Sequence, residues 1–174
     1  MKPETLSSKT DYKGKVFDIR LDEIREGELV YKREIVVHKG SAVIIPVFAD
    51  GTVGLVRQYR HAAGRYLLEI PAGTLELGED PLFGAIRELE EEIGVVAEKV
   101  EKLSEFYVSP GFLTEKMFVY LATGLTETAQ HLEGDEIIEI ERIPLDEALE
   151  MTRDGRIEDA KTIIGLQLGQ ARLP

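Results

Sequence analysis

Three carboxylates, Glu88, Glu91 and Glu92, lie close together in the segment RELEEEIGV, which ends at Val95. If this segment is helical, each residue advances by about 100° around the axis, so that Glu91 lies at roughly 300° and Glu92 at roughly 40° from Glu88. The three side chains then share one face of the helix. Carboxylate oxygens are the ligands that hard divalent ions such as Mg²⁺ and Mn²⁺ prefer, so the spacing predicts a metal site.

Other ligand chemistries have little support in the sequence. The chain has no Cys, and its histidines, His38, His61 and His131, share no metal-ligand spacing, which disfavours Zn²⁺. The simplest alternative is that the acidic run is an ordinary solvated helix face. Like charges at this spacing repel each other by about a few tenths of a kcal/mol per pair, and only Arg87 offsets them. The cluster therefore favours a cation as its partner.

Length and charge narrow the possible functions further. At 174 residues, the chain fits one domain with a small appendage. Its formal charge is -12, from 21 basic and 33 acidic residues, which disfavours general binding to nucleic acids or anionic membranes. An acidic protein that handles phosphates needs metal cations to bridge them. No apolar run approaches the roughly 18 residues of a membrane-spanning helix, no signal-peptide pattern is evident and Cys is absent, so we expect a cytoplasmic protein.

The first third of the chain has the pattern of β-strands. Residues 14–38 alternate apolar and polar side chains on both sides of a turn at Glu26-Gly27-Glu28, which predicts a β-hairpin. The apolar run AVIIPVF and the segment TVGLVRQYR flank the turn signal Asp50-Gly51, which predicts a second hairpin whose first strand is buried on both faces. The change of pattern at residues 39–41 predicts a boundary between an N-terminal region, 1–39, and a main domain, 40–174.

The carboxylate segment is expected to lie on a helix from Pro81 to Ile93, with Asp80 as N-cap and Gly94 as its end. A separate apolar stripe can pack this helix on a sheet, and it consists of Leu82, Ala85, Ile86, Leu89 and Ile93. The remaining elements are predicted strands at 67–72, 100–109, 116–124 and 137–144, and predicted helices at 145–151 and 158–171. Because regular βαβ alternation is lacking, we expect an α+β or α/β sandwich with a mixed sheet.

The segment from Gly73 to Val95 resembles the conserved box of the Nudix hydrolase family at every fixed position: Gly, five residues, Glu, seven residues, then Arg-Glu-apolar-x-Glu-Glu-x-Gly-apolar. The resemblance implies an α/β/α sandwich with a mixed sheet and hydrolysis of a nucleoside diphosphate linked to another moiety. It also implies that Glu79 and Arg87 orient the loop and the helix. The metal ligands that it implies are Glu88, Glu91, Glu92 and the backbone carbonyl of Ala72.

The segment Ser109-Pro110-Gly111-Phe112 could be a simple turn after the strand EFYV. Its position, with Pro110 fifteen residues past Val95, looks like the mark of the ADP-ribose pyrophosphatase branch of the family. The segments KREIVVHKG, VRQYR, LEIPAG and DAKTIIGLQ extend this resemblance over most of the chain. The branch implies a homodimer in which the N-terminal hairpins are exchanged, and an extra sheet within one chain is the alternative.

The resemblance to this branch also suggests substrate-binding residues, each of which could otherwise be an ordinary exposed polar residue. Arg60 is expected to bind a phosphate, and Arg57 either assists it or pairs with an acid at the surface. The adenosine end of the substrate is expected to meet Lys32, Arg33 and Glu34. The ribose and phosphate portion is expected to meet Glu76, Ser109, Gly111 and Glu115.

Hydrolysis needs a water in line with the diphosphate, a base and stabilisation of the phosphate charge. The expected cofactor is Mg²⁺, as two or three ions, with Mn²⁺ as a substitute, and the expected products are AMP and ribose 5-phosphate. The branch places the base on an acidic loop, where Glu136 is our choice and Glu133 and Asp135 are alternatives; Glu91 is the second predicted catalytic residue. Alternative functions are hydrolysis of another nucleoside diphosphate derivative, a dinucleoside polyphosphate or a damaged nucleotide, and non-catalytic sensing of ADP-ribose.

Overall fold

The computed structural model describes residues 2–132, 134 and 136–173. The chain forms two compact units: unit 1 consists of residues 1–40 and 106–117, and unit 2 consists of residues 41–105 and 118–174. The presence of residues 106–117 in unit 1 was not expected from the sequence. The functional division into a dimerisation region, 1–39, and a catalytic domain, 40–174, stays a prediction.

Unit 1 is built on an antiparallel sheet of strand order β1-β2-β3, with β1 at Glu4–Lys13, β2 at Asp18–Glu26 and β3 at Leu29–Val37. The predicted hairpin is confirmed as β2 and β3, and Gly27 takes the positive φ of 62° that its tight turn needs. The loop from the other part of unit 1 continues this pairing, because Val36 N donates to Phe112 O at 2.8 Å.

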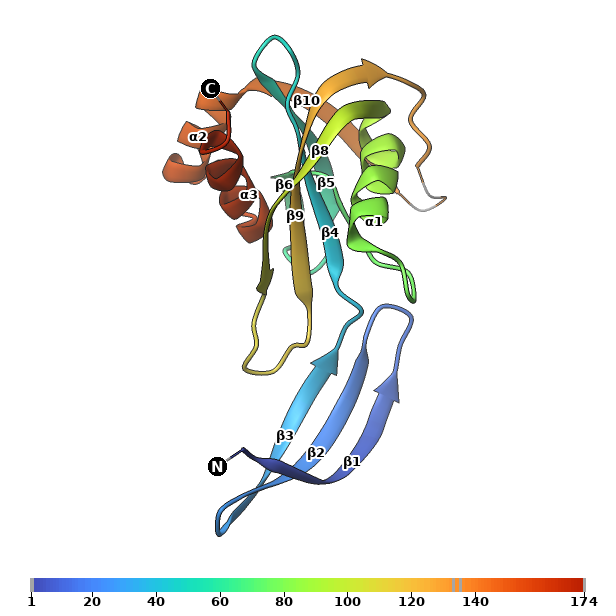
Figure 1. Ribbon diagram of the computed structural model, residues 1–174, viewed down its shortest axis with the longest axis vertical. Coiled ribbons are helices and arrows are strands. Elements are labelled where there is room, and N and C mark those ends of the chain that lie inside the picture. Colours follow the sequence, from blue (N-terminus) through green and yellow to red (C-terminus); the bar gives the residue numbers. More distant parts are fainter. Residues whose placement is uncertain (1, 133, 135, 174) are drawn as a thin grey trace. The chain divides into compact units, whose positions relative to one another are not determined.

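Unit 2 contains two sheets (Figure 1). The four-stranded sheet has the order β7-β4-β9-β8, and the three-stranded sheet has the order β10-β5-β6. β7 is antiparallel to β4, whereas β9 runs beside β4 in the same direction, so the larger sheet is mixed, as predicted (Figure 1). The strands are β4 (Ser41–Pro46), β5 (Thr52–Arg60), β6 (Arg65–Glu69), β7 (Ala72–Thr74), β8 (Val95–Tyr107), β9 (Lys116–Glu127) and β10 (Ile138–Pro144).

The predicted second hairpin is wrong, although its strands and its turn exist. β4 and β5 belong to different sheets, and an isolated bridge between Val47, just after β4, and Val53 of β5 links them near the turn. β4 lies between β7 and β9 in the interior of its sheet, and all of its residues are buried. β5 instead pairs with β10 and β6. The turn signal therefore identified a chain reversal but not the partners of the strands.

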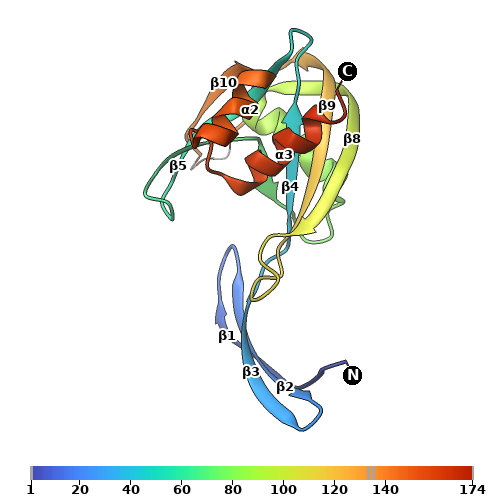
Figure 2. The same cartoon turned by 90° about the vertical axis from the view of Figure 1, so that its left-hand side faces the viewer.

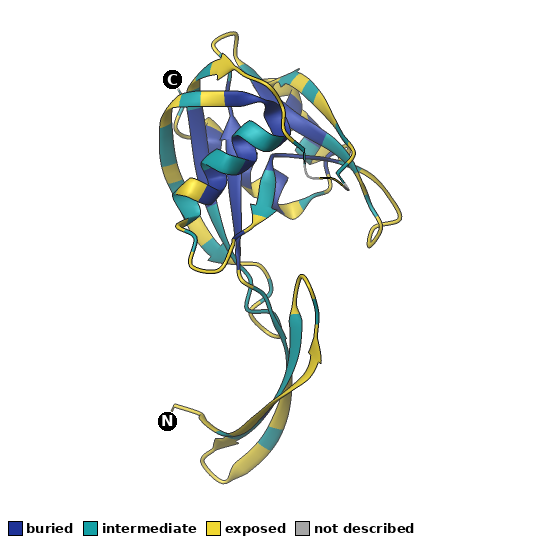
Figure 3. Ribbon diagram, turned by 90° about the vertical axis from the view of Figure 1, so that its right-hand side faces the viewer, coloured by how far each residue is buried: buried dark blue, intermediate teal, exposed yellow. Residues whose placement is uncertain are grey.

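Helices cover both faces of the larger sheet (Figures 1 and 2). α1 (Pro81–Glu88) packs on β4 from one side, and α3 (Ala160–Gln170) packs on it from the other, beside α2 (Leu145–Asp154). Figure 3 shows that burial is concentrated in the strands and helix faces between these layers. Among the described residues, no helix is long and apolar enough to cross a bilayer.

The sequence predicted one regular α-helix for the carboxylates, and this prediction is wrong in its second half. Asp80 caps α1 by accepting a hydrogen bond from Leu82 N at 2.8 Å, but from Leu89 to Ile93 the chain forms a π-helical turn, η1. A π turn has i→i+5 hydrogen bonds and is wider than an α turn, so the regular 100° advance does not hold there. Gly94, with a φ of 69°, ends the helix at the predicted position.

Candidate active site

Strand β7 and the carboxylate helix, which consists of α1 and η1, meet at Gly73. A Cβ atom at this position would lie 1.7 Å from Oε1 of Glu88 and 2.1 Å from its Cδ. The carboxylate of Glu88 therefore occupies the space that a side chain at residue 73 would need, and only glycine permits this approach. The side chain of Glu88 is 8% exposed and lies against β7 at Gly73.

Arg87 links the loop between β7 and α1 to the carboxylate helix. Its Nη1 donates to Glu88 at 2.6 Å and to Glu91 at 2.8 Å, and its Nε donates to Glu79 at 3.1 Å. Glu79 also accepts a hydrogen bond from Glu76 N at 2.8 Å, which holds the loop. The Glu79–Arg87 pair thus orients the loop relative to the helix through direct contacts.

Glu92 is buried beside Glu88, with 3% of its surface exposed. It accepts a hydrogen bond from Ala72 N at 3.2 Å. Burial raises the pKa of Glu88 to about 7, and burial together with the charge of Glu88 raises the pKa of Glu92 to about 8. Two neighbouring carboxylates in such surroundings resist carrying negative charge without a cation.

The segment after β9 closes over the end of this helix. Thr128 N donates to Gly94 O at 2.7 Å, and Gln130 Nε2 donates to Glu92 O at 2.7 Å. His131 N donates to Glu91 O at 3.1 Å. These bonds satisfy backbone carbonyls at the end of the π turn, and they fix the start of the acidic loop beside the carboxylates.

The donor set fits a divalent metal ion. Glu88, Glu91, Glu92 and the carbonyl of Ala72 would supply only oxygen ligands, and the buried, closely spaced carboxylates need positive charge. No group of three His, Asp or Glu side chains among the described residues is already arranged as a set of metal ligands. Arg87 holds oxygens of both Glu88 and Glu91, so a metal ion would compete with it for them.

Glu136 lies close to the same carboxylates. Its negative charge contributes to raising the pKa of both Glu88 and Glu92, which places it within electrostatic range of the predicted ligands. The alternatives for the base, Glu133 and Asp135, lie outside the described residues.

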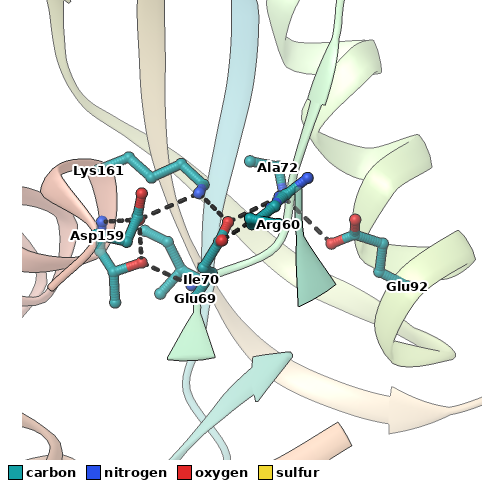
Figure 4. Close-up of polar contacts among 8 residues, drawn as sticks. Arg60, Glu69, Ile70, Ala72, Glu92, Asp159 and Lys161 are labelled. Atoms are coloured by element: carbon teal, nitrogen blue, oxygen red, sulfur yellow. Dashed lines mark hydrogen bonds and ion pairs between the residues drawn. The ribbon is translucent and has the colours of Figure 1, made fainter. Parts of the chain in front are cut away.

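Arg60, the predicted phosphate ligand, interacts electrostatically with one of the carboxylates. The charges of Arg60 and Glu92 act on each other, and both oxygens of Glu69 accept hydrogen bonds from Arg60 (Figure 4). Arg57 lies on the same strand but donates to Glu141 across β5 and β10, so it adopts the alternative foreseen for it, a pair with an acid near the surface.

Comparison with known proteins agrees with this geometry. The model of the NUDIX domain matches residues 38–164. The chain belongs to the NUDIX family. An ADP-ribose pyrophosphatase of Bacillus subtilis (strain 168) is 37% identical over 99% of this chain and 95% of its own length. A methanol dehydrogenase activator of Bacillus methanolicus is 39% identical over 94% of this chain and 90% of its own length.

A solved structure supports the Nudix fold. The crystal structure of an ADP compounds hydrolase superposes with a TM-score of 0.85 at 23% identity, covering 99% of this chain and 98% of that one. Nudix hydrolases act on diphosphate linkages and generally use divalent metal ions, which agrees with the carboxylate donor set.

The other predicted substrate residues of this Nudix protein divide between the two units. Glu76 is exposed on the loop of unit 2 before α1. In unit 1, Lys32, Arg33 and Glu34 are exposed on β3, where alternation puts Lys32 and Glu34 on one face and Arg33, stacked over Tyr31 at 4.2 Å, on the other. One ligand on one face of β3 therefore could not contact all three side chains.

The loop that contains Ser109, Gly111 and Glu115 belongs to unit 1. Ser109 O accepts hydrogen bonds from Phe112 N and Leu113 N, at 3.2 and 3.0 Å, so the segment is a turn in its local structure. Glu115 Oε1 lies 3.8 Å from His38 Nδ1. The structure thus brings this loop to the end of β3, within the same unit as Lys32 and Glu34.

The residues that sequence reasoning missed in this Nudix fold are Glu69 and Lys161. Glu69 is buried and bound to Arg60, and Lys161 is its second partner. A signal was present, because each is a charged residue within an apolar stretch, LLEIPA and AKTIIGL. Charges that are buried in such surroundings are usually paired.

Proposed function

We propose that this chain hydrolyses ADP-ribose to AMP and ribose 5-phosphate, with Mg²⁺ as its cofactor and Mn²⁺ as a substitute. One observation carries the proposal: Arg60, a cation suited to a phosphate, lies beside Ala72, whose N–H donates to Glu92 of the carboxylate helix at 3.2 Å (Figure 4). A phosphate ligand and a metal-binding helix in one place suit a diphosphate substrate. The likeness to the Bacillus subtilis ADP-ribose pyrophosphatase supports ADP-ribose as that substrate.

The chain's own residues divide the work of the reaction. Glu88, Glu91, Glu92 and the carbonyl of Ala72 would hold the metal, and Arg60 would bind and orient a phosphate. When bound, divalent ions would neutralise the phosphate oxygens and lower the pKa of the attacking water. Glu136 would accept the proton of that water, because it combines nearness to the carboxylates with a place on the acidic loop.

The remaining substrate contacts are proposed to come from unit 1. Lys32 and Glu34 would meet the adenosine end of the substrate. Ser109, Gly111 and Glu115 would meet its ribose and phosphate portion, together with Glu76 of unit 2. Arg33 is the weaker candidate, since it lies on the other face of β3 from Lys32 and Glu34.

We also propose that the active form is a homodimer with exchanged N-terminal regions. None of the described apolar side chains of unit 1 is buried. Tyr12, Leu29 and Val30 are exposed on its strands, and Val16 and Phe17 are exposed between β1 and β2. A small sheet gains stability when its apolar side chains pack on another surface. A second copy of the chain would provide that surface. The cytoplasmic location stays a prediction from the sequence.

A substrate panel tests the proposed activity. ADP-ribose, another nucleoside diphosphate sugar and a dinucleoside polyphosphate are each incubated with Mg²⁺ or Mn²⁺, and nucleotide products are measured. ADP-ribose is expected to give AMP with the highest kcat/KM. Equal rates on all substrates would refute the preference for ADP-ribose, and absence of hydrolysis of any of them would refute the proposed activity.

A further inference from the structure

Unit 2 contains a buried network of charges beside the carboxylate helix (Figure 4). The carboxylate of Glu69, at the end of β6, accepts hydrogen bonds from Arg60 Nε at 2.8 Å and Arg60 Nη2 at 2.7 Å. It accepts another from Lys161 Nζ, and Lys161 also pairs with Asp159 at 3.1 Å. The side chains of Glu69 and Lys161 are 2% and 9% exposed. Water and salt therefore screen this pair much less than a surface pair.

The presence of this buried pair calls for an explanation beyond stability. Two charges that leave water lose solvation free energy, and replacing such a pair by apolar residues of similar size is often neutral or stabilising. An apolar pair at positions 69 and 161 would thus fill the same space. Such an apolar pair could not accept the hydrogen bonds that hold the guanidinium of Arg60 in place.

Glu69 fixes the orientation of Arg60. A guanidinium has five N–H donors in one plane, and the two-point bond to Glu69 uses the edge formed by Nε and Nη2. Within the described part of the chain, Arg60 Nη1 has no hydrogen-bond acceptor, and the side chain of Arg60 is 39% exposed. An arginine that is already fixed loses less conformational entropy when it binds a ligand.

Lys161 in turn fixes Glu69, through the first turn of α3. Asp159 caps this helix by accepting a hydrogen bond from Thr162 N at 2.9 Å, and the Thr162 hydroxyl accepts one from Ile70 N at 2.9 Å. The chain between β6 and β7 is therefore held at residues 69 and 70 by α3. At Ala72 the chain is held by Glu92, whose carboxylate accepts a hydrogen bond from Ala72 N at 3.2 Å.

We propose that Glu69 and Lys161 are positioning residues, which hold Arg60 rigid so that its free end receives a phosphate of the substrate. The proposal rests on the phosphate-binding role of Arg60 in the proposed function. It gives a role to the segment DAKT, residues 159–162, which otherwise lies outside the reaction. Lys161 touches neither the substrate nor the metal and acts only through Glu69 and Arg60.

A binding experiment tests this chain of contacts without depending on turnover. The probe is α,β-methylene ADP-ribose, in which a methylene group replaces the bridging oxygen and prevents hydrolysis, and its Kd is measured by calorimetry with Mg²⁺. Lys161→Met and Arg60→Ala are each expected to weaken binding about tenfold, as expected for the loss of an ordered charge-assisted contact. The double variant is expected to bind within about twofold of Arg60→Ala, because Lys161 has no effect once Arg60 is gone.

Hydrolysis of ADP-ribose by the same variants separates positioning from a general structural role. Lys161→Met should raise KM about tenfold and leave kcat within about twofold, because the carboxylate helix is untouched. Lys161→Arg should restore much of the affinity, since it keeps a charged donor. Lys99→Met is the matched control, because it removes the same charge from an exposed position of unit 2, and its Kd should equal that of the wild type.

If Lys161→Met does not fold, the variant Glu69→Gln with Lys161→Met replaces it, because removing both charges leaves no buried ion unpaired. That variant should also lose about tenfold in affinity, and Arg60→Ala should add nothing to it. Unchanged affinity of Lys161→Met, or of Glu69→Gln with Lys161→Met where that variant replaces it, would overturn the positioning role alone, and so would the same loss with and without Arg60. Wild-type affinity of Arg60→Ala would overturn the phosphate-binding role of Arg60 and the positioning role with it.

Discussion

The carboxylate of Glu88 lies in the space that a side chain at Gly73 would occupy, and a Cβ there would come within 1.7 Å of Oε1. This contact sets how closely the carboxylate helix approaches β7, which begins at Ala72. Two groups proposed to bind one metal ion, the carboxylate of Glu88 and the carbonyl of Ala72, therefore depend on the absence of a side chain at one residue.

Gly73→Ala is expected to displace Glu88 and to lower kcat/KM for ADP-ribose about a hundredfold, because displacements of about 1 Å in an active site have effects of this size. Steady-state kinetics with Mg²⁺ measures the loss. Gly111→Ala is the control for stability, since a Cβ at Gly111 meets no atom within 4 Å, and its Tm should equal that of the wild type. Wild-type kcat/KM in Gly73→Ala would contradict the proposed geometry.

Glu92→Gln is expected to keep the fold but to abolish the stabilisation of the protein by Mg²⁺. A metal ion that binds only the folded state raises Tm with its concentration. The wild type should therefore show a rising Tm in a Mg²⁺ titration, and Glu92→Gln should show a flat one together with loss of most hydrolysis. Glu90→Gln lies in the same π turn and has no ligand role, so it should behave like the wild type. Equal titration curves for Glu90→Gln and Glu92→Gln would disprove the assignment.

The pair of Glu69 with its cations predicts a pH dependence of stability. Burial alone would raise the pKa of Glu69, but Arg60 and Lys161 outweigh burial and hold that pKa below its usual value of 4.5. A lowered folded-state pKa gives stability that is present above the unfolded pKa and is lost as the pH falls through the folded pKa. Gln resembles protonated Glu, so Glu69→Gln should be less stable than the wild type by about 3 kcal/mol at neutral pH.

Urea unfolding from neutral pH to about pH 3 checks this prediction, because the difference in unfolding free energy should shrink only below the usual carboxyl pKa. Glu158→Gln is the control, since Glu158 pairs with Arg65 at the surface and should contribute little at any pH. A constant difference for Glu69→Gln across the range would mean that the charge of Glu69 does not stabilise the fold.

The exposed apolar side chains of unit 1 predict a dimer that one substitution can weaken. Leu29 is 69% exposed on β3, and Leu29→Glu should raise the dimer dissociation constant at least about tenfold. Sedimentation equilibrium measures this constant. Leu77→Glu introduces the same charge at an exposed position of unit 2 and should leave it unchanged. A monomeric wild type at all accessible concentrations would contradict the proposed assembly.

The elements that sequence reasoning located are those whose signals are local. Asp80, Pro81 and Gly94 bound the carboxylate helix in the structure as they do in the sequence, because caps and positive-φ glycines act within a few residues. The π turn at Leu89 has no such signal, since it depends on how the helix packs. β1 was missed because ETLSSKTDYK is mostly polar, and it becomes a strand through pairing with β2.

Long-range partners were harder to predict. The turn at Asp50-Gly51 was located, but the separation of β4 and β5 into two sheets depends on strands more distant in the sequence. The bond between Glu69 and Lys161 joins residues 92 positions apart, and neither residue carries a motif that names the other. The proposed metal ligands could be picked out from the sequence because their carboxylates lie close together on one helix, whereas the support of Arg60 comes from another helix.

Glu136→Gln tests the proposed base. Removal of a general base typically lowers the rate by about 10²- to 10⁴-fold, so kcat should fall within this range. Binding of α,β-methylene ADP-ribose with Mg²⁺ should stay within about twofold of the wild type, because Gln keeps the size of the side chain and the ligand set is intact. Glu133→Gln and Asp135→Asn are the comparison variants, and each should keep kcat within about threefold. If Glu133→Gln or Asp135→Asn lowered kcat to this extent and Glu136→Gln did not, the base would be Glu133 or Asp135. Glu136 would then affect the site only through the effect of its charge on Glu88 and Glu92.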